Sequence, residues 1–398
     1  MQSLRILHVT PYFADAWAYG GIPRLAHAMT RGLARRGHHV TVCTTDACDA
    51  TTRLPPRSVS CTPDGVEVRM FPNLSNRLAY RFQFFLPRGL DRYARRYAAT
   101  FDVAHLHACH NLPGVIAARR LRGAGVPYVV QPNGTAPRIE RRKAAKAVFD
   151  AIAGRQVIDG ATRIIAVTDA ETRQLRQVGV DAGRIHVIPN PVDLQEFAPP
   201  IAQGRFRARF NLGTQPLVLY LGTLTPRKRL DVLAEAFARL GRADCALVIA
   251  GNDMGSDSST RALVRRLGIH DQTTFTGLLR GGERVEALAD ATVVVYPSQD
   301  EIFGLVPLEA LLCGSPAIVA DDSGCGEVAA ITGGSTIVPL GDVGAVTRAI
   351  AAVLANPGAA KARACHAAAR VRRLYGEDVV CEQLESLYCE VAAGVRRS

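Results

Sequence analysis

Short apolar runs alternate along this chain with longer stretches whose apolar residues recur every three or four positions. The runs predict buried strands, and the helically spaced stretches predict helices. In the first half the predicted strands are Leu4–Thr10, His39–Thr44, Asp102–His107, Pro127–Gln131 and Arg163–Thr168, and the predicted helices are Ile22–Arg36, Leu112–Leu121 and Asp169–Gln177. Because strands and helices alternate, we expect a parallel sheet with right-handed crossovers.

The same alternation begins again after a stretch rich in Pro, Gly and Arg, Leu194–Thr214, which predicts a hinge. The second set of strands is Leu217–Gly222, Ala246–Ala250, Thr273–Thr276, Thr292–Tyr296 and Ala317–Ala320, and its helices are Arg229–Leu240, Arg261–Leu267, Arg284–Ala289 and Val343–Ala355. We therefore expect two doubly wound α/β domains, residues 1–195 and 196–375, and a final helix, 376–398, that packs back towards the first. Ligands of such sheets bind at the carboxyl ends of the strands, so we expect a site in a cleft between the domains.

Composition agrees with a globular protein of two domains: the chain has 398 residues, of which 48% are hydrophobic and 21% charged. No apolar run approaches the roughly 20 residues that span a bilayer, and the first residues lack the pattern of a signal peptide, so we expect a cytoplasmic protein. The ten cysteines include no CxxC pair, which argues against a disulfide scaffold and a zinc site.

The formal net charge of +12 favours anionic partners, such as nucleotide sugars, phosphorylated lipids, an anionic membrane face or nucleic acid. An arginine-rich surface without any special partner explains the same charge. Because no nucleic-acid recognition motif is present, we expect no nucleic-acid partner.

The stretch from Glu301 to Pro316 concentrates the candidate chemistry. It follows the predicted strand Thr292–Tyr296 and enters an apolar helix, which places Glu301 in the loop and Glu309 on the helix. Between the two carboxylates, the N–H groups that begin the helix have no helical partner and attract phosphate oxygens. Gly304 has no side chain to block a ligand's approach. Such an arrangement could hold a sugar, a diphosphate and a ribose in turn.

Two glutamates eight positions apart are common by chance, but Phe303-Gly304 between them and the turn Cys313–Pro316 after them make the pattern specific. It resembles the signature of the family-4 (GT4) retaining glycosyltransferases, also called glycosyl transferases group 1. The resemblance, which covers nearly the whole chain, implies the GT-B fold, with two Rossmann-like domains facing across a cleft. It also implies transfer of a sugar from a UDP- or GDP-sugar to a glycan, lipid-linked or small-molecule acceptor, in bacterial cell-surface polysaccharide or glycolipid synthesis. No metal or other cofactor is expected.

The same resemblance implies roles for single residues. Glu301 would hold sugar hydroxyls, Glu309 the ribose hydroxyls, and Lys228 the diphosphate together with the backbone of Gly304. Other donor contacts would come from Phe303, Leu305, the base-binding loop Gly277, Leu278 and Leu279, and the turn Gly20-Gly21, which is alternatively a simple tight turn.

Thr223 departs from the family pattern, because it stands where the family usually has an arginine that contacts the donor. We hypothesise that Arg227 supplies the missing charge from a nearby position. The same departure motivates the alternative of a binding protein that has lost catalysis. A nucleotide-sugar epimerase of the same fold is another alternative, against which the combination of Lys228, Glu301 and Glu309 argues.

Three histidines, His105, His107 and His110, suggest a metal site at first sight. We expect His105 and His107 to alternate along their strand, one facing the cleft and the other the core, which argues against shared metal ligation. The resemblance makes His107 a contact to the hydroxyls of the transferred sugar, and a core or capping histidine is the alternative.

Arginines and aromatic residues interleave between Arg77 and Arg96, and a second basic cluster spans Arg138–Lys146. Both suit an anionic lipid-linked acceptor and peripheral binding to the inner face of the plasma membrane. A solvated basic helix face with an aromatic core face is the alternative, and Pro87 argues against one long amphipathic helix. The sequence leaves open the sugar, the choice between UDP and GDP, the acceptor and the oligomeric state.

Overall fold

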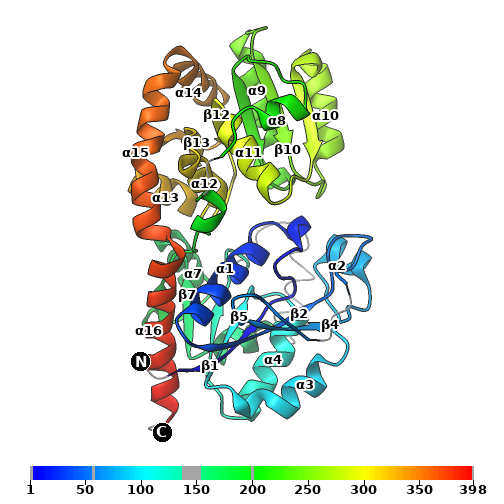
Figure 1. The fold of residues 1–398 in the computed structure, drawn as a ribbon, viewed down its shortest axis with the longest axis vertical. Coiled ribbons are helices and arrows are strands. Elements are labelled where there is room, and N and C mark those ends of the chain that lie inside the picture. The colour runs from blue at the N-terminus through cyan, green and yellow to red at the C-terminus, as the bar shows by residue number, and fades with distance from the viewer. Residues whose placement is uncertain (1–2, 56–58, 137–153, 199–200, 397–398) are drawn as a thin grey trace. The chain divides into compact units, whose positions relative to one another are not determined.

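A computed structural model describes residues 3–55, 59–136, 154–198 and 201–396 of the chain. The chain forms two compact units, shown in Figure 1: residues 1–191 together with 377–398, and residues 192–376. The basic cluster Arg138–Lys146 lies outside the described residues.

Unit 1 is built on an eight-stranded sheet with the order β3-β4-β2-β1-β5-β6-β7-β8, parallel except for the pair β3–β4. Its strands are β1 (Arg5–Val9), β2 (His39–Thr45), β3 (Ser60–Cys61), β4 (Glu67–Phe71), β5 (Val103–His107), β6 (Tyr128–Gln131), β7 (Arg163–Ala166) and β8 (Ile185–Val187). Its α-helices are α1 (Ile22–Arg35), α2 (Asn76–Phe82), α3 (Leu90–Tyr97), α4 (Leu112–Gly123), α6 (Arg155–Asp159), α7 (Asp169–Gln177) and α16 (Glu377–Arg396). Short 3-10 turns are η1 (Trp17–Tyr19), η2 (Ala98–Thr100) and η4 (Ala182–Arg184).

The last helix belongs to unit 1 although the chain reaches it only after unit 2. Helix α16 packs against α1 and β5. Arg31 on α1 forms a buried ion pair with Glu377, and Arg36 donates to Glu385 at 2.6 Å. These contacts, together with buried Val380, Leu384 and Tyr388, complete the core of unit 1.

Unit 2 is built on a six-stranded parallel sheet with the order β11-β10-β9-β12-β13-β14. Its strands are β9 (Leu217–Leu221), β10 (Ala246–Ala250), β11 (Thr273–Gly277), β12 (Val293–Tyr296), β13 (Ala317–Asp321) and β14 (Ser335–Pro339). Its α-helices are α8 (Arg205–Arg209), α9 (Leu230–Leu240), α10 (Asp257–Arg266), α11 (Gly282–Asp290), α12 (Leu305–Leu312), α13 (Gly324–Thr332), α14 (Val343–Ala355) and α15 (Pro357–Tyr375). The 3-10 turns are η5 (Leu194–Phe197), η6 (Pro226–Lys228) and η7 (His270–Gln272).

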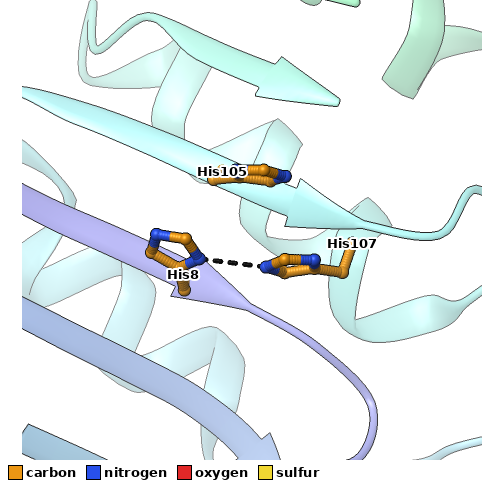
Figure 2. Close-up of side chains that lie close together, drawn as sticks. All are labelled: His8, His105 and His107. Carbon is orange, nitrogen blue, oxygen red and sulfur yellow. Dashed lines mark hydrogen bonds between the residues drawn. The ribbon is translucent and has the colours of Figure 1, made fainter. Parts of the chain in front are cut away.

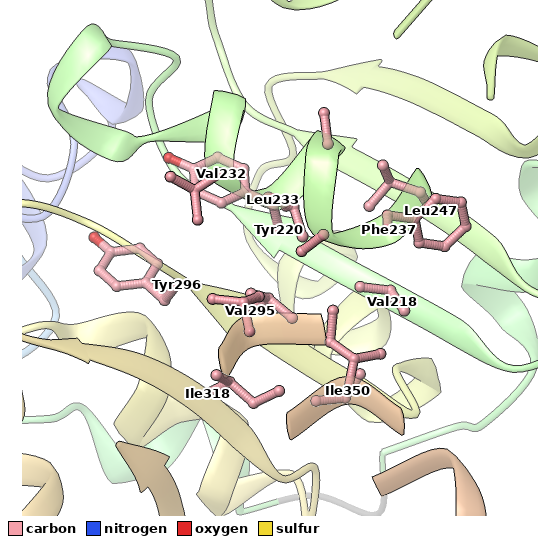
Figure 3. Close-up of a cluster of buried hydrophobic side chains, with 14 of the residues drawn as sticks. Val218, Tyr220, Val232, Leu233, Phe237, Leu247, Val295, Tyr296, Ile318 and Ile350 are labelled. Carbon is pink, nitrogen blue, oxygen red and sulfur yellow. The ribbon is translucent and has the colours of Figure 1, made fainter. Parts of the chain in front are cut away.

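The main core of unit 2 lies between its sheet and the helices α9 and α14. Figure 3 shows Leu233 and Phe237 of α9 and Ile350 of α14 packed over Val218 and Val295 of the central strands. All five side chains are almost completely buried. This packing makes β9 and β12 a rigid base for the loops that follow them.

The predicted hinge Leu194–Thr214 is wrong in position. Phe206 and Leu212 are buried in the core of unit 2, and the backbone N–H of Gly204 donates to Asp290 at 2.6 Å, so this stretch is part of that unit. The chain crosses between the units at residues 191/192 and 376/377, where the sequence predicted 195/196 and 375/376. The N–H of Val192 donates to the Tyr375 carbonyl at 2.7 Å, which joins the two crossing segments inside unit 2.

In the part of the chain that the structure describes, no single helix combines the length and hydropathy needed to cross a membrane. The pair α14 and α15 meets the criterion only when the two helices are taken together, and they are bent by 100° at the break between them.

Candidate active site

The strand order of unit 2 reverses at β9, whose neighbours are β10 on one side and β12 on the other. In open parallel sheets the ligand crevice lies at the carboxyl ends of the strands where the order reverses. Lys228 follows β9 and Glu301 follows β12, so the topology brings these two predicted residues to the same edge of the sheet.

Lys228, Tyr296 and Glu301 form one hydrogen-bonded cluster at this edge. The Lys228 Nζ donates to the Tyr296 hydroxyl at 2.6 Å and pairs with the Glu301 carboxylate, and the Tyr296 hydroxyl donates to the same carboxylate at 3.2 Å. Lys228 is buried, and the Glu301 side chain keeps 19% of its surface exposed. The sequence predicted Lys228 and Glu301 as site residues but missed Tyr296. Its position at the carboxyl end of a predicted strand could have indicated that it belongs to the site.

Glu301 is held as an anion. Burial by itself would raise its pKa, but the charges of Lys228 and Arg227 and the hydrogen bonds from Lys228 and Tyr296 outweigh burial and lower it. Burial beside Glu301 raises the pKa of Tyr296, which therefore keeps its proton at neutral pH. The Glu301 carboxylate can accept hydrogen bonds from hydroxyls, but it has no proton to donate.

The loop that carries Glu301 is fixed by the loop after β13. The Glu301 carbonyl accepts from the Ser323 hydroxyl at 2.7 Å and from the Cys325 N–H at 2.8 Å, and the Asp300 N–H donates to Asp322 at 2.7 Å. These contacts show that the loop Asp322–Glu327 supports the position of Glu301.

Gly304 caps helix α12 with φ +74°, a left-handed conformation that side chains rarely adopt. A Cβ at this position would collide with the Sγ of Cys325. The sequence interpretation, in which the missing side chain leaves room for a ligand, therefore needs correction: glycine is required by backbone conformation and by packing on Cys325. Leu305 begins the helix, and the buried Phe303 ring packs edge-on against Tyr375, with the ring centroids 5.4 Å apart.

Glu309 lies on α12 as predicted, but it is only 1% exposed and is paired. Its Oε2 accepts from Arg284 of α11 at 2.6 Å, and the other terminal nitrogen of Arg284 pairs with Glu196 of η5. Arg284 also lies over the Phe197 ring, 5.8 Å from its centroid. Sequence reasoning missed this three-residue ion cluster, because 88 positions separate Glu196 from Arg284 and no periodic pattern connects them.

The other predicted donor residues of unit 2 lie on loops at the same ends of the strands. Thr223 follows β9, and its carbonyl accepts from the Tyr220 hydroxyl at 2.9 Å. Arg227 lies in η6 beside Lys228, and its charge contributes to the lowered pKa of Glu301. Gly277 ends β11 with φ +72°, Leu278 is partly buried, and Leu279 is buried in the core.

In unit 1, the strand order reverses at β1, between β2 and β5, and three histidines lie there. Figure 2 shows His8 on β1 and His105 and His107 on β5; the His8 Nδ1 is hydrogen-bonded to the His107 Nε2 at 2.9 Å. The rings of His105 and His107 stack with centroids 4.2 Å apart. The expectation that these two histidines face opposite ways is therefore wrong, because residues two apart on a strand share a face.

The third histidine of the cluster is His8, not His110 as the sequence suggested. Ring nitrogens of His8, His105 and His107 lie within 4.8 Å of one another, the one such group among the described residues. A metal ion needs ring nitrogens that converge, whereas the planes of His105 and His107 are within 10° of parallel and His8 and His107 share a hydrogen bond. The geometry favours hydrogen bonding over metal ligation.

All three histidines are neutral at physiological pH. Burial lowers the pKa of His107 to about 3 and also lowers the pKa values of His8 and His105. The Nδ1 of His105 is hydrogen-bonded to the Tyr388 hydroxyl at 2.5 Å. His107 has no exposed surface, so a sugar hydroxyl reaches it only if neighbouring groups move. Gly20, with φ +88°, and Gly21, the N-cap of α1, form the turn after η1 at the same end of the sheet.

Two family models match the chain: Glycosyltransferase Family 4 over residues 19–196 and Glycosyl transferases group 1 over residues 203–372. A protein of Xylanimonas cellulosilytica named D-inositol 3-phosphate glycosyltransferase is 30% identical, with 93% of this chain and 92% of the relative covered. A Mycolicibacterium smegmatis protein of the same name is 32% identical, with 83% and 78% covered. The chain belongs to the family-4, group 1 glycosyltransferases, as the resemblance implied.

Solved structures agree on the fold. Sucrose-phosphate synthase from Thermosynechococcus elongatus matches with a TM-score of 0.76 at 22% identity, covering 98% of this chain and 99% of that one. Anabaena HepE, solved in complex with UDP-glucose, matches with a TM-score of 0.74 at 17% identity, covering 97% and 100%. Two units with parallel sheets and these neighbours confirm the predicted GT-B fold.

Proposed function

We propose that this glycosyltransferase transfers a hexose, with retention of anomeric configuration, from a UDP- or GDP-sugar bound to unit 2. The observation that carries the proposal is the cluster of Lys228, Tyr296 and Glu301 at the point where the strand order of unit 2 reverses, next to the start of α12. The complex of HepE with UDP-glucose supports a nucleotide-sugar donor.

In this mechanism Lys228 and the first N–H groups of α12 stabilise the diphosphate as it leaves. The bond between the anomeric carbon and the phosphate oxygen breaks, and its electron pair stays on the diphosphate. The acceptor oxygen bonds to the anomeric carbon on the same face, and its proton passes to a diphosphate oxygen. Glu301, an anion, accepts hydrogen bonds from sugar hydroxyls and holds Lys228 in place. No metal ion has a part in the proposal.

Glu309 is the proposed holder of the ribose hydroxyls. In the structure its carboxylate is buried against Arg284, so a ribose has to share that carboxylate with the guanidinium or displace it. Arg284 therefore belongs to the proposed donor site as the residue that orients Glu309.

For the acceptor we propose an anionic polyol, and inositol phosphate is the first compound to test. The support is the name shared by the relatives from X. cellulosilytica and M. smegmatis, together with the net charge of +12. A lipid-linked glycan at the cytoplasmic membrane face is the second acceptor class.

The donor proposal is tested by calorimetric titration of UDP, GDP and 2′,3′-dideoxy-UDP into the wild-type protein and two variants. If Glu309 holds the ribose, the wild type loses roughly tenfold or more in affinity with the dideoxy nucleotide, because the buried carboxylate then lacks the hydrogen bonds from the ribose hydroxyls, although its pair with Arg284 remains. Glu309→Gln should bind the normal nucleotide weakly and discriminate little against the dideoxy one. Glu235→Gln, on α9 of the same unit, is the matched control and should behave as wild type. A Glu309→Gln protein with unchanged discrimination contradicts the ribose role.

Turnover assays separate the alternatives. Incubation of the bound donor with inositol phosphate, followed by NMR of the new glycosidic bond, should show the donor's anomeric configuration in the product. Isomerised donor without acceptor would indicate an epimerase instead. Tight nucleotide-sugar binding without transfer to either acceptor class would indicate a binding protein.

A further inference from the structure

Tyr296 contacts both charged residues of its cluster, yet the mechanism proposed above gives it no part. It is the last residue of β12, and only 5% of its surface is exposed. The Lys228 Nζ donates to its hydroxyl at 2.6 Å, and the same hydroxyl donates to Glu301 at 3.2 Å. The phenol therefore joins the loop that follows β9 to the loop that follows β12.

The direction of these hydrogen bonds follows from the chemistry of the three groups. An ammonium group only donates and an ionised carboxylate only accepts, so the single phenolic proton of Tyr296 is directed to Glu301. Burial beside Glu301 raises the pKa of Tyr296 well above its ordinary value, and the proton stays on the phenol. Tyr296 thus has no proton to pass to a leaving group at neutral pH, and it acts through Lys228 and Glu301.

Both donors bind the same oxygen of Glu301. Lys228 and Tyr296 contact Oε2, and in the described part of the chain Oε1 has no hydrogen-bond partner, while the side chain keeps 19% of its surface exposed. The terminal torsion of a glutamate is otherwise soft, so two donors on one oxygen keep the two oxygens from exchanging places. Oε1 is therefore the oxygen that faces a ligand.

Lys228 is oriented in the same way. Two of the three N–H groups of its ammonium donate to Tyr296 and Glu301, which are the hydrogen-bond partners of Nζ among the described residues. The Nζ also lies 4.6 Å from the centroid of the Tyr296 ring, within the range of a cation–π contact. The third N–H is left for an anionic ligand.

The ring of Tyr296 is itself fixed by packing. It lies within 11° of parallel to the ring of Tyr220 on β9, with the centroids 6.1 Å apart, and Figure 3 shows both hydroxyls at the same side of the core. Tyr220 is completely buried, and its hydroxyl donates to the Thr223 carbonyl at 2.9 Å. The Tyr296 hydroxyl is thus presented from a rigid support.

We propose that Tyr296 is a positioning residue for the transfer reaction: its hydroxyl ties the Lys228 ammonium to Oε2 of Glu301, so that Oε1 meets a sugar hydroxyl and the third Lys228 N–H meets the leaving diphosphate. The inference rests on the proposed function and adds a residue to it. The alternative is a core tyrosine whose hydroxyl matters only for stability, and a phenylalanine would fill the same space.

The test is Tyr296→Phe, which keeps the stacked ring and removes only the hydroxyl. In steady-state kinetics with UDP-glucose and inositol phosphate, kcat should fall by roughly tenfold to a hundredfold, because the two charged groups lose their fixed geometry. The donor KM should change by less than about threefold, since the lost contact acts mainly on the diphosphate as it leaves. A change in stability alone would not produce this division between kcat and KM.

The charge state of Glu301 gives a second measurement, which needs neither nucleotide nor acceptor. The hydrogen bond from Tyr296 helps to lower the pKa of Glu301, so its loss should raise that pKa. Carbon-13 NMR of the glutamate carboxyl groups, assigned with Glu301→Gln, follows the titration. The acid limb of kcat/KM should also move to higher pH in Tyr296→Phe, because protonation removes the acceptor and the counter-ion of Lys228.

The other titratable groups that face Glu301 are the same in the wild type and in Tyr296→Phe. They are Lys228, Arg227, Tyr220, Asp322 and Cys325. A difference between the two titrations is therefore caused by the hydroxyl that was removed.

Tyr128→Phe in unit 1 is the matched control. Tyr128 is 1% exposed, and its hydroxyl donates to the Val157 carbonyl at 2.9 Å, so the variant also loses one buried tyrosine hydrogen bond. It should keep the kcat and the Glu301 titration of the wild type. Equal losses of kcat in both variants would indicate general destabilisation and overturn the inference.

Failure of the inference is distinguishable from failure of the proposed function. A Tyr296→Phe protein with wild-type kcat and an unmoved Glu301 pKa overturns the positioning role and leaves the transfer reaction standing. If the wild type transfers no sugar, the proposed function is at fault, and the ligand-free titration decides about Tyr296 alone. A raised Glu301 pKa then supports the tie between Lys228 and Glu301, and an unmoved one overturns it.

Discussion

The ion cluster around Arg284 leads to the most specific prediction about stability. Arg284 and Glu309 have side chains that are 5% and 1% exposed, and Glu196, the other partner of Arg284, is 25% exposed. Arg284→Met keeps most of the side-chain volume but leaves both carboxylates without their cation. Breaking a buried ion pair by removing one partner costs about 3–5 kcal/mol, because the remaining charge is desolvated and unpaired. We expect the free energy of unfolding to fall by about that amount.

A second substitution separates the charge effect from packing. In Arg284→Met with Glu309→Gln, the carboxylate that stays is Glu196, which is partly hydrated. Replacing both partners of a buried pair is often close to neutral, so the double variant should recover most of the lost stability. Arg239→Met, an exposed arginine on α9, is the control and should change stability by less than about 0.5 kcal/mol.

Urea unfolding followed by circular dichroism measures these free energies, with the same dependence on urea expected for all variants. The single tryptophan, Trp17, lies in unit 1, so its fluorescence shows whether the loss is confined to unit 2. The reasoning is refuted if Arg284→Met loses less than about 1 kcal/mol, or if the double variant is no more stable than the single one.

Three further predictions concern the active site and the core. Lys228→Met should lower kcat by roughly 10²–10³-fold in a folded protein, because the positive charge that stabilises the leaving diphosphate is lost. Steady-state kinetics measure this effect, and a near-normal kcat would exclude the role. Gly304→Ala should destabilise the protein by at least about 1–2 kcal/mol from its left-handed backbone alone, with more from the Cys325 contact, and Cys325→Ala should relieve only the second part. Thermal unfolding of the single and double variants distinguishes the two contributions. Burial raises the pKa of Glu171 to about 7 from its ordinary 4.5, although N–H donors from Gly134 and Val167 oppose the shift. Between those values the folded protein keeps a proton that the unfolded chain has lost, so its stability falls as pH rises through the window, by on the order of 3 kcal/mol. In Glu171→Gln the free energy of unfolding should no longer fall with pH across this window. If the fall is as large as in the wild type, other titrating groups cause it.

Most predicted elements of the sheets exist close to their predicted bounds, because apolar periodicity is a local property. Strand β10 was predicted at its observed bounds, Ala246–Ala250, and α7 likewise at Asp169–Gln177. Errors arise where capping decides a boundary. The helix predicted from Arg261 begins at Asp257, since Asp253 accepts from the N–H groups of Gly255, Ser256 and Asp257 and starts the helix one turn earlier.

In the candidate site, too, local sequence patterns indicated some residues, whereas contacts between distant segments could not be predicted. Glu301, Glu309 and Lys228 could be predicted because each belongs to a short motif beside a recognisable strand or helix. The partners that define their chemical state could not. Tyr296 joins Lys228 from 68 positions away, Arg284 neutralises Glu309 from another helix, and His8 meets His107 across 99 residues.

The amino-acid sequence alone determined that this protein has two parallel α/β units and a strand–loop–helix motif from Glu301 to Glu309, for which we propose donor binding, because strands, helices and helix N-termini follow from local patterns of apolar, small and charged residues. Only the tertiary structure decided which charges are paired, that His8 joins His105 and His107 in one buried cluster, and which apolar side chains remain outside. Those properties depend on burial and on contacts between distant segments, and burial sets both the cost of an unpaired charge and the pKa of each titrating group.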